Sequence, residues 1–345
     1  MYLGIVEGRK CRVSKDAPNG SVCITGISGS GKSCRQNRIE LEEVKKGNTV
    51  IAIDFSRNHQ RKDIFEHIRV EYDSFTNRID AVRDGIGIRL FTPFQSRDKE
   101  PGRYVNIINS NVQAFSASVR MGDKQKAVLR NAIERAMEIQ SKNPMTNELE
   151  GLIMALEEID SSEAQSVYQK LWTVLNSGVI RTVGQSILEK KINIIDLSGL
   201  DMNSSEIVAE VLLAYLWRVA YNIGFSDKYG KVIVVLDEFQ HCSIRKYSTL
   251  QTMLREGRRI GLNLLLTTQT LDIFNREEQA MLNQTAVHLY FHPAESEKIR
   301  CAKVIDSGRA SEWKEQLGRL QRGECIAVGA LEVNGIEITR PLILK

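Results

Sequence analysis

The stretch GISGSGKS, from Gly26 to Ser33, decides which fold the rest of the sequence must form. It matches the pattern G-x-x-x-x-G-K-[ST], whose backbone N–H groups surround phosphate oxygens and whose glycines permit close approach. The apolar run VCIT (22–25) precedes the loop, and a helical pattern follows it from Lys32 to about Lys46. Because the pattern binds phosphate in this strand–loop–helix setting, we expect a P-loop nucleotide site.

The loop supplies most of the candidate nucleotide ligands. The ammonium group of Lys32 would reach the β- and γ-phosphates of ATP, and the hydroxyl of Ser33 would bind Mg²⁺. The residues predicted to contact the nucleotide in and directly after the loop are Gly26, Ser28, Gly29, Ser30, Gly31, Lys32, Ser33 and Cys34.

Two later apolar runs end in polar residues that suit hydrolysis. VIVVL (232–236) leads into Asp237 and Glu238. A carboxylate at the tip of a buried strand can hold the water shell of Mg²⁺, which is the role predicted for Asp237. Glu238 could then act as general base toward the attacking water. LLLTT (264–268) ends at Gln269, whose amide could contact both the γ-phosphate and this water.

Continuous apolar strands that alternate with helical segments indicate an α/β fold with a mainly parallel sheet. Between residues 105 and 190 the apolar residues recur with the period of a helix. Asp160 with Glu163 resembles a capping box that opens the last of these helices. We therefore expect one α/β P-loop domain over residues 1–345 with a helical insertion at 105–190. Further strands are predicted at 49–54, 88–94, 191–199, 287–291, 324–330 and 338–345, and further helices at 204–222 and from about 241 to 257.

Composition and charge narrow the class of protein. Of 345 residues, 42% are hydrophobic and 26% are charged, as in soluble globular proteins. No stretch approaches the roughly 20 apolar residues of a membrane span, so we expect a cytoplasmic protein without membrane insertion. The six cysteines lack C-x-x-C spacing, which favours free thiols over a zinc site. The net charge of +4 is too small to indicate nucleic-acid binding, but RNHQRK (57–62) and REGRR (255–259) are locally basic.

The ordered set of motifs resembles the HerA/FtsK superfamily of P-loop motors, which includes DNA translocases and the ATPases of conjugation and type IV secretion. The resemblance covers most of the chain and implies a RecA/FtsK-like core that assembles into a homohexameric ring. It rests on DEFQ (237–240), LREGRRIGLNLLLTTQ (254–269), TVIAIDF (49–55), INIIDLSGL (192–200) and QRGECIAVG (321–329).

The resemblance supports the roles predicted above for Lys32, Ser33, Asp237, Glu238 and Gln269. It also places Arg258 or Arg259 at the position that supplies an arginine finger to a neighbouring subunit. There the guanidinium would neutralise charge beside the γ-phosphate. The alternative is that Arg258 and Arg259 only form a basic cluster at the carboxyl end of a helix, where the helix dipole favours positive charge.

The match at Asp54 is less complete. Asp54 corresponds to an acid of the family, which makes it a candidate nucleotide-binding residue. The family continues with a Pro-His-Gly-Glu-like turn, however, whereas this chain has FSRN at 55–58. Only Asp54 is therefore carried over.

Three functions remain open at this point. The first is an ATP-driven motor that moves DNA through a ring, with RNHQRK as a candidate DNA contact. The second is an ATPase that energises a protein machine, either in secretion or conjugation or in a phage-defence complex with a nuclease or other effector. The third is a nucleotide-binding scaffold that does not hydrolyse ATP. Because the loop begins 25 residues from the start, we expect a motor core that depends on a partner protein.

Overall fold

The structure is a computed structural model that describes residues 1–60, 64–92, 101–144, 146–223 and 229–345. Its main sheet contains β3 (Val22–Thr25), β4 (Thr49–Asp54), β5 (Thr76–Asp80), β8 (Ile192–Asp196), β9 (Val232–Asp237), β10 (Leu262–Thr268), β11 (Val287–Tyr290), β12 (Cys325–Gly329) and β15 (Leu342–Leu344).

The described strands of this sheet follow the order β15-β12-β11-β3-β10-β9-β4-β8-β5. The strands from β11 to β5 in that order are parallel, and β12 and β15 add an antiparallel edge. The central strands β4 and β9 are apolar except at their ends because both of their faces are buried; every residue of β4 and of β9 is buried. The predicted mainly parallel sheet is thus confirmed.

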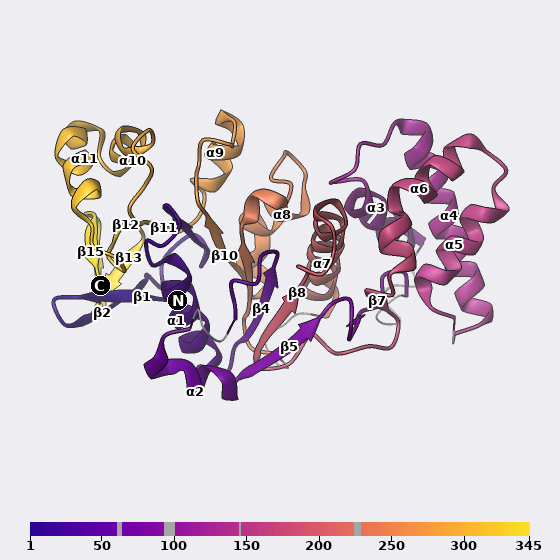
Figure 1. Ribbon diagram of the computed structural model, residues 1–345, viewed down its shortest axis with the longest axis horizontal. Helices are drawn as coiled ribbons and strands as arrows, with labels where there is room; N and C mark the ends of the chain where they lie inside the picture. Colours follow the sequence, from indigo (N-terminus) through magenta and orange to yellow (C-terminus); the bar gives the residue numbers. More distant parts are fainter. Residues whose placement is uncertain (61–63, 93–100, 145, 224–228) are drawn as a thin grey trace.

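Helices and a second sheet cover the two faces of the main sheet (Figure 1). On one face lie α1 (Lys32–Val44), α2 (Glu66–Ser74) and a small antiparallel sheet of β1 (Tyr2–Val6), β2 (Arg9–Val13), β13 (Leu331–Val333) and β14 (Ile336–Ile338). On the other face lie α7 (Met202–Ile223) and α8 (Thr249–Glu256). The small sheet was not predicted, since its strands are short and come from both ends of the chain.

Four helices form a bundle beside α7 at one end of the molecule, opposite the small sheet (Figure 1). They are α3 (Pro101–Phe115), α4 (Asp123–Lys142), α5 (Glu148–Glu158) and α6 (Ser162–Asn176), and the short strands β6 (Ile86–Gly87) and β7 (Ile180–Arg181) pair nearby. The remaining helices are α9 (Arg276–Leu282), α10 (Lys298–Ile305) and α11 (Ala310–Arg319), with single 3-10 turns η3 (Phe239–His241), η4 (Gly257–Ile260) and η5 (Ser307–Arg309). Among the described residues, no helix is both long and apolar enough to cross a membrane.

The strand predicted at 88–94 is wrong over its described part, 88–92, and residues 93 and 94 lie outside the described residues. The buried carboxylate of Glu148 in α5 accepts hydrogen bonds from the backbone N–H groups of Leu90, Phe91 and Thr92. The guanidinium of Arg218 in α7 donates to the carbonyl oxygens of the same segment. Side chains therefore satisfy the backbone groups that a strand would have paired.

Two predicted helix ends also differ from the structure. The segment after β9 forms only η3 before α8 begins at Thr249, so the predicted helix from about 241 is much shorter. At the start of α6 the cap is Ser161, whose hydroxyl accepts from the N–H of Ala164 at 3.1 Å. The predicted cap, Asp160, is thus off by one residue.

The cap of α6 can be tested by a pair of substitutions. Ser161→Ala should lower the free energy of unfolding by about 1 kcal/mol, because the first turn of α6 loses a hydrogen-bond acceptor. Asp160→Ala should change it little, since Asp160 is exposed. Urea unfolding followed by circular dichroism measures both variants, and a larger loss for Asp160→Ala would refute the assignment.

Candidate active site

The loop between β3 and α1 has a backbone that only glycine adopts easily. Gly26 and Gly31 have φ of 147° and 110°, and Gly31 is the left-handed N-cap of α1. A Cβ on Gly26 would lie 2.7 Å from the side chain of Phe291, and one on Gly31 would lie 2.8 Å from the backbone of Gly323. The tight loop leaves its N–H groups at the amino end of α1, where the helix dipole favours anions.

Lys32 is held inside this loop. Its Nζ donates to the carbonyl oxygens of Gly26 at 2.6 Å and of Ile27 at 3.0 Å. Burial lowers the pKa of Lys32, while the carboxylates of Glu238 and Asp237 partly oppose the shift. The cation is therefore positioned between the loop and two consecutive acids at the carboxyl end of β9.

Asp237 ends β9 and is 3% exposed. Burial raises the pKa of Asp237 to about 6, and the charges of Asp54 and Glu238 add to this, while His59 and Asn58 act against it. Within the described part of the chain, its Oδ2 has no hydrogen-bond partner. A buried, unpartnered carboxylate oxygen that shares a cavity with the Ser33 hydroxyl fits a Mg²⁺ ion and its water shell.

Glu238 has a left-handed backbone, with φ of 60°, and two amides orient its carboxylate. Gln269 Nε2 donates to its Oε1 at 2.7 Å, and Gln240 Nε2 donates to its Oε2 at 2.6 Å. Thr268 in turn donates to the amide oxygen of Gln240 at 3.0 Å. Sequence reasoning missed Gln240, although its place two residues after Glu238 in DEFQ was available as a signal.

The acids and the loop line one cavity of about 480 Å³. Of the predicted residues it brings together Ser28, Gly29, Gly31, Lys32, Ser33, Cys34, Asp237, Glu238 and Gln269. Gly26, Ser30, Asp54, Arg258 and Arg259 lie outside this lining. Asn58, Arg69 and Arg322 also face the cavity and were not predicted.

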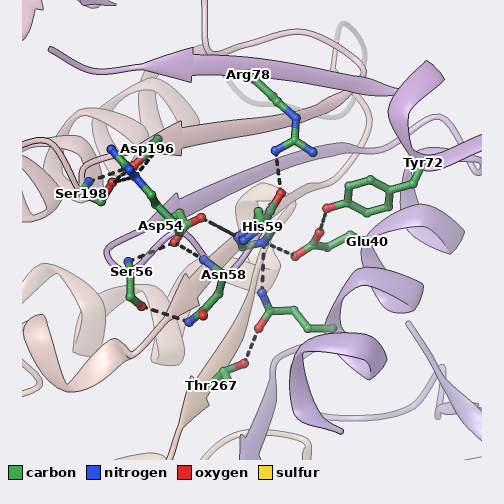
Figure 2. Close-up of polar contacts among 12 residues, drawn as sticks. Glu40, Asp54, Ser56, Asn58, His59, Tyr72, Arg78, Asp196, Ser198 and Thr267 are labelled. Carbon is green, nitrogen blue, oxygen red and sulfur yellow. Dashed lines mark hydrogen bonds and ion pairs between the residues drawn. The ribbon is translucent and has the colours of Figure 1, made fainter. Parts of the chain in front are cut away.

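Asp54 lies behind this cavity, in a buried polar cluster with His59 and Glu40 (Figure 2). His59 Nδ1 lies 3.2 Å from Asp54 Oδ2, and His59 Nε2 lies 3.1 Å from Glu40 Oε1. Burial alone would lower the pKa of His59, but the two carboxylates raise it well above its usual value. Burial alone would likewise raise the pKa of Asp54, yet His59 lowers it to about 2.

The basic segment RNHQRK is therefore only partly a surface feature. His59 is 1% exposed, while Arg57 donates to Ser198 Oγ at 2.6 Å and lies 3.7 Å from Asp196 Oδ2. Arg61 and Lys62 lie outside the described residues. The expectation that this segment contacts DNA thus rests on fewer free charges than the sequence suggested.

A turn at 321–324, between α11 and β12, packs against the phosphate loop. The N–H of Gly323 donates to the carbonyl oxygen of Ser30 at 2.8 Å. Arg35 of α1 holds this turn by donating from Nη2 to the carbonyl oxygen of Gly323 at 3.0 Å. These contacts place Arg322, the residue before Gly323, at the wall of the cavity.

Arg258 and Arg259 lie at the opposite edge of the sheet. Both belong to η4, which precedes β10, whereas Gln269 follows β10 directly. The seven residues of β10 span roughly 20 Å, so neither arginine reaches the cavity of its own chain. Both are exposed, and Arg258 donates to the carbonyl oxygen of Ala17.

The sequence model of the AAA-like domain family matches residues 6–333. Among solved structures, VirB4 of Thermoanaerobacter pseudethanolicus is similar with a TM-score of 0.68 and 17% identity over 100% of this chain and 95% of that one. The plasmid coupling protein TrwB in complex with a non-hydrolysable ATP analogue is similar with a TM-score of 0.66 and 10% identity, over 95% of this chain and 86% of that one. No curated protein matches the chain in sequence.

Arg322 gives a test of the cavity as a nucleotide site. Arg322→Ala should weaken binding of a fluorescent ADP analogue with Mg²⁺ by about 2 kcal/mol, on the order of a thirtyfold rise in Kd, because a charged donor to phosphate is lost. Arg319→Ala is the matched control, since this exposed arginine on α11 pairs with Glu315. Equal affinities for Arg322→Ala and wild type would show that Arg322 makes no contact with the nucleotide.

Proposed function

Because this chain belongs to the AAA-like domain family of P-loop ATPases of the FtsK/HerA type, we propose that it hydrolyses ATP as a ring motor that moves DNA. The observation that carries the proposed hydrolysis is the contact between Glu238 and Gln269 in the cavity of the phosphate loop. A scaffold that only binds nucleotide has no use for an oriented acid beside Lys32. We propose ATP as the nucleotide because the family is one of ATPases; the similar TrwB structures hold a non-hydrolysable ATP analogue, ADP with Mg²⁺ or a non-hydrolysable GTP analogue.

The residues of the cavity divide the work of hydrolysis. The loop N–H groups and Lys32 hold the β- and γ-phosphates, and Ser33 with Asp237 would hold Mg²⁺, which would neutralise charge on the phosphate oxygens. Glu238 takes a proton from the attacking water as the bond between the γ-phosphorus and the bridging oxygen breaks. Gln269, which donates to Glu238, keeps that carboxylate aimed at the water.

The position of Arg258 and Arg259 supports a site completed by a second copy of the chain. Neither reaches its own cavity, but both are exposed at the far edge of the sheet, where a neighbouring subunit in a ring could receive them. A guanidinium supplied in this way stabilises the transition state by about 10³- to 10⁵-fold in rate. We propose that the helices at 105–190 are an insertion within the single domain 1–345, because α3 and α6 pack on α7 of the core.

Mixing two inactive variants tests this arrangement. Glu238→Gln should bind ATP but stop turnover, and the double variant Arg258→Ala/Arg259→Ala should also lose turnover. Mixed rings should regain part of it, because some sites then combine an intact Glu238 with arginines from a Glu238→Gln neighbour. Phosphate release measures turnover, and Glu315→Gln is the control because Glu315 is exposed on α11. Mixtures that stay inactive would argue against an arginine supplied in trans.

DNA as the moved substrate requires a separate measurement. Duplex or single-stranded DNA should raise the rate of phosphate release, and the effect should fall steeply with salt because non-specific contacts are made to phosphates. Heparin at matched charge controls for a general polyanion effect. ATP turnover that DNA neither changes nor requires would instead assign the chain to the ATPases that energise a protein machine.

A further inference from the structure

Three residues on neighbouring strands form a row at the carboxyl edge of the sheet. Asp54 of β4 pairs in register with Asp237 of β9, which pairs in turn with Thr267 of β10. Residues in register on parallel strands point to the same face, and this face is the one that α1 covers, as the burial of Ala52, Val235 and Leu265 against α1 shows. The row therefore lies directly under the helix that begins at the phosphate loop.

The helix α1 meets this row through polar side chains on one of its faces. Gln36 and Glu40 lie one and two turns after Ser33, so all three project from the same side of α1. The hydroxyl of Thr267 donates to Gln36 Oε1 at 2.6 Å, and the amide nitrogen of Gln36 lies 3.1 Å from His59 Nε2. The other ring nitrogen of His59, Nδ1, contacts Asp54 Oδ2, and Glu40 Oε2 accepts a hydrogen bond from the hydroxyl of Tyr72 in α2 (Figure 2).

Every member of this chain of contacts is at most 2% exposed: Gln36, Glu40, Asp54, His59, Tyr72 and Thr267. Buried polar groups are stable only when they are paired, so the cluster favours one arrangement of its side chains. A movement of α1 relative to β10 would break the contact between Gln36 and Thr267. Thr267 is two residues before Gln269, which holds Glu238.

We propose that Gln36 and Thr267 are positioning residues that couple occupancy of the phosphate loop to the placement of Gln269 and Glu238. The inference rests on the proposed ATPase function of this site. Binding of phosphate at the amino end of α1 fixes the helix, Gln36 then fixes the end of β10 through Thr267, and Gln269 directs Glu238. Neither residue touches the nucleotide, so each acts on turnover through the catalytic pair.

The test removes one hydroxyl without changing the volume of the side chain. Thr267→Val should lower kcat by about tenfold and leave KM for ATP within about twofold, because the nucleotide ligands remain intact. Thr267→Ser keeps the hydroxyl and should restore kcat. Thr49→Val is the matched control: Thr49 is a fully buried strand threonine whose hydroxyl donates to the carbonyl oxygen of Tyr229 at 2.8 Å, at the other edge of the sheet.

Hydrogen exchange gives a readout that does not depend on turnover. In the wild type, a non-hydrolysable ATP analogue with Mg²⁺ should slow exchange both in the phosphate loop (26–33) and at the end of β10 (268–272). In Thr267→Val the loop should still be protected, and the protection at 268–272 should be lost. If Thr267→Val fails to fold, Gln36→Met is measured in the same way.

The outcomes separate the two proposals. Equal protection at 268–272 in Thr267→Val and Thr49→Val, or equal kcat, would overturn the coupling while the ATPase function stands. A wild type that binds the analogue without protection at 268–272 would overturn it as well. A wild type that shows this protection but no turnover would contradict the proposed hydrolysis and still support the coupling.

Discussion

The candidate site depends on the register of three parallel strands. Asp54, Asp237 and Thr267 are direct neighbours across β4, β9 and β10, and all three face α1. Because successive side chains point to opposite faces of a sheet, a slip of β9 by one residue would turn Asp237 toward α7 and remove it from the cavity. The position of Asp237, the acid proposed to bind the metal, relative to the phosphate loop is therefore a property of the whole sheet.

Buried charge makes this register hard to change. His59 contacts carboxylates on both sides, Glu40 from α1 and Asp54 from β4, and all three are nearly inaccessible to water. Removing one partner would leave an uncompensated charge in the interior, which is far more costly than losing a surface pair. The cluster therefore specifies one packing of α1 on the sheet, and a shifted helix would have to separate these ions.

The parts of the fold that follow from local pattern could be predicted from the sequence. The phosphate loop, Asp237 with Glu238, and Gln269 each end an apolar run, so their meeting at one edge follows from parallel strands. The small sheet and the 321–324 turn could not be predicted, because each is made by contacts between distant parts of the chain. His59 looked like part of a basic surface segment, and only the tertiary fold shows that it is buried beneath α1.

The small sheet also determines when the site can be completed during synthesis. β2 pairs with β13, and Ser14 donates to Glu337, which lies 323 residues later in the chain, at 2.5 Å. Arg35, in the first turn of α1, donates to the carbonyl oxygens of Leu3 in β1 and of Gly323 in the 321–324 turn. The start of α1 is therefore also held by contacts with both ends of the sequence. A nascent chain on the ribosome thus carries its phosphate loop long before the residues that brace it exist. Turnover of ATP should accordingly begin only after synthesis has passed β13 and β14, whose residues hold the segment before the phosphate loop from the far end of the sequence.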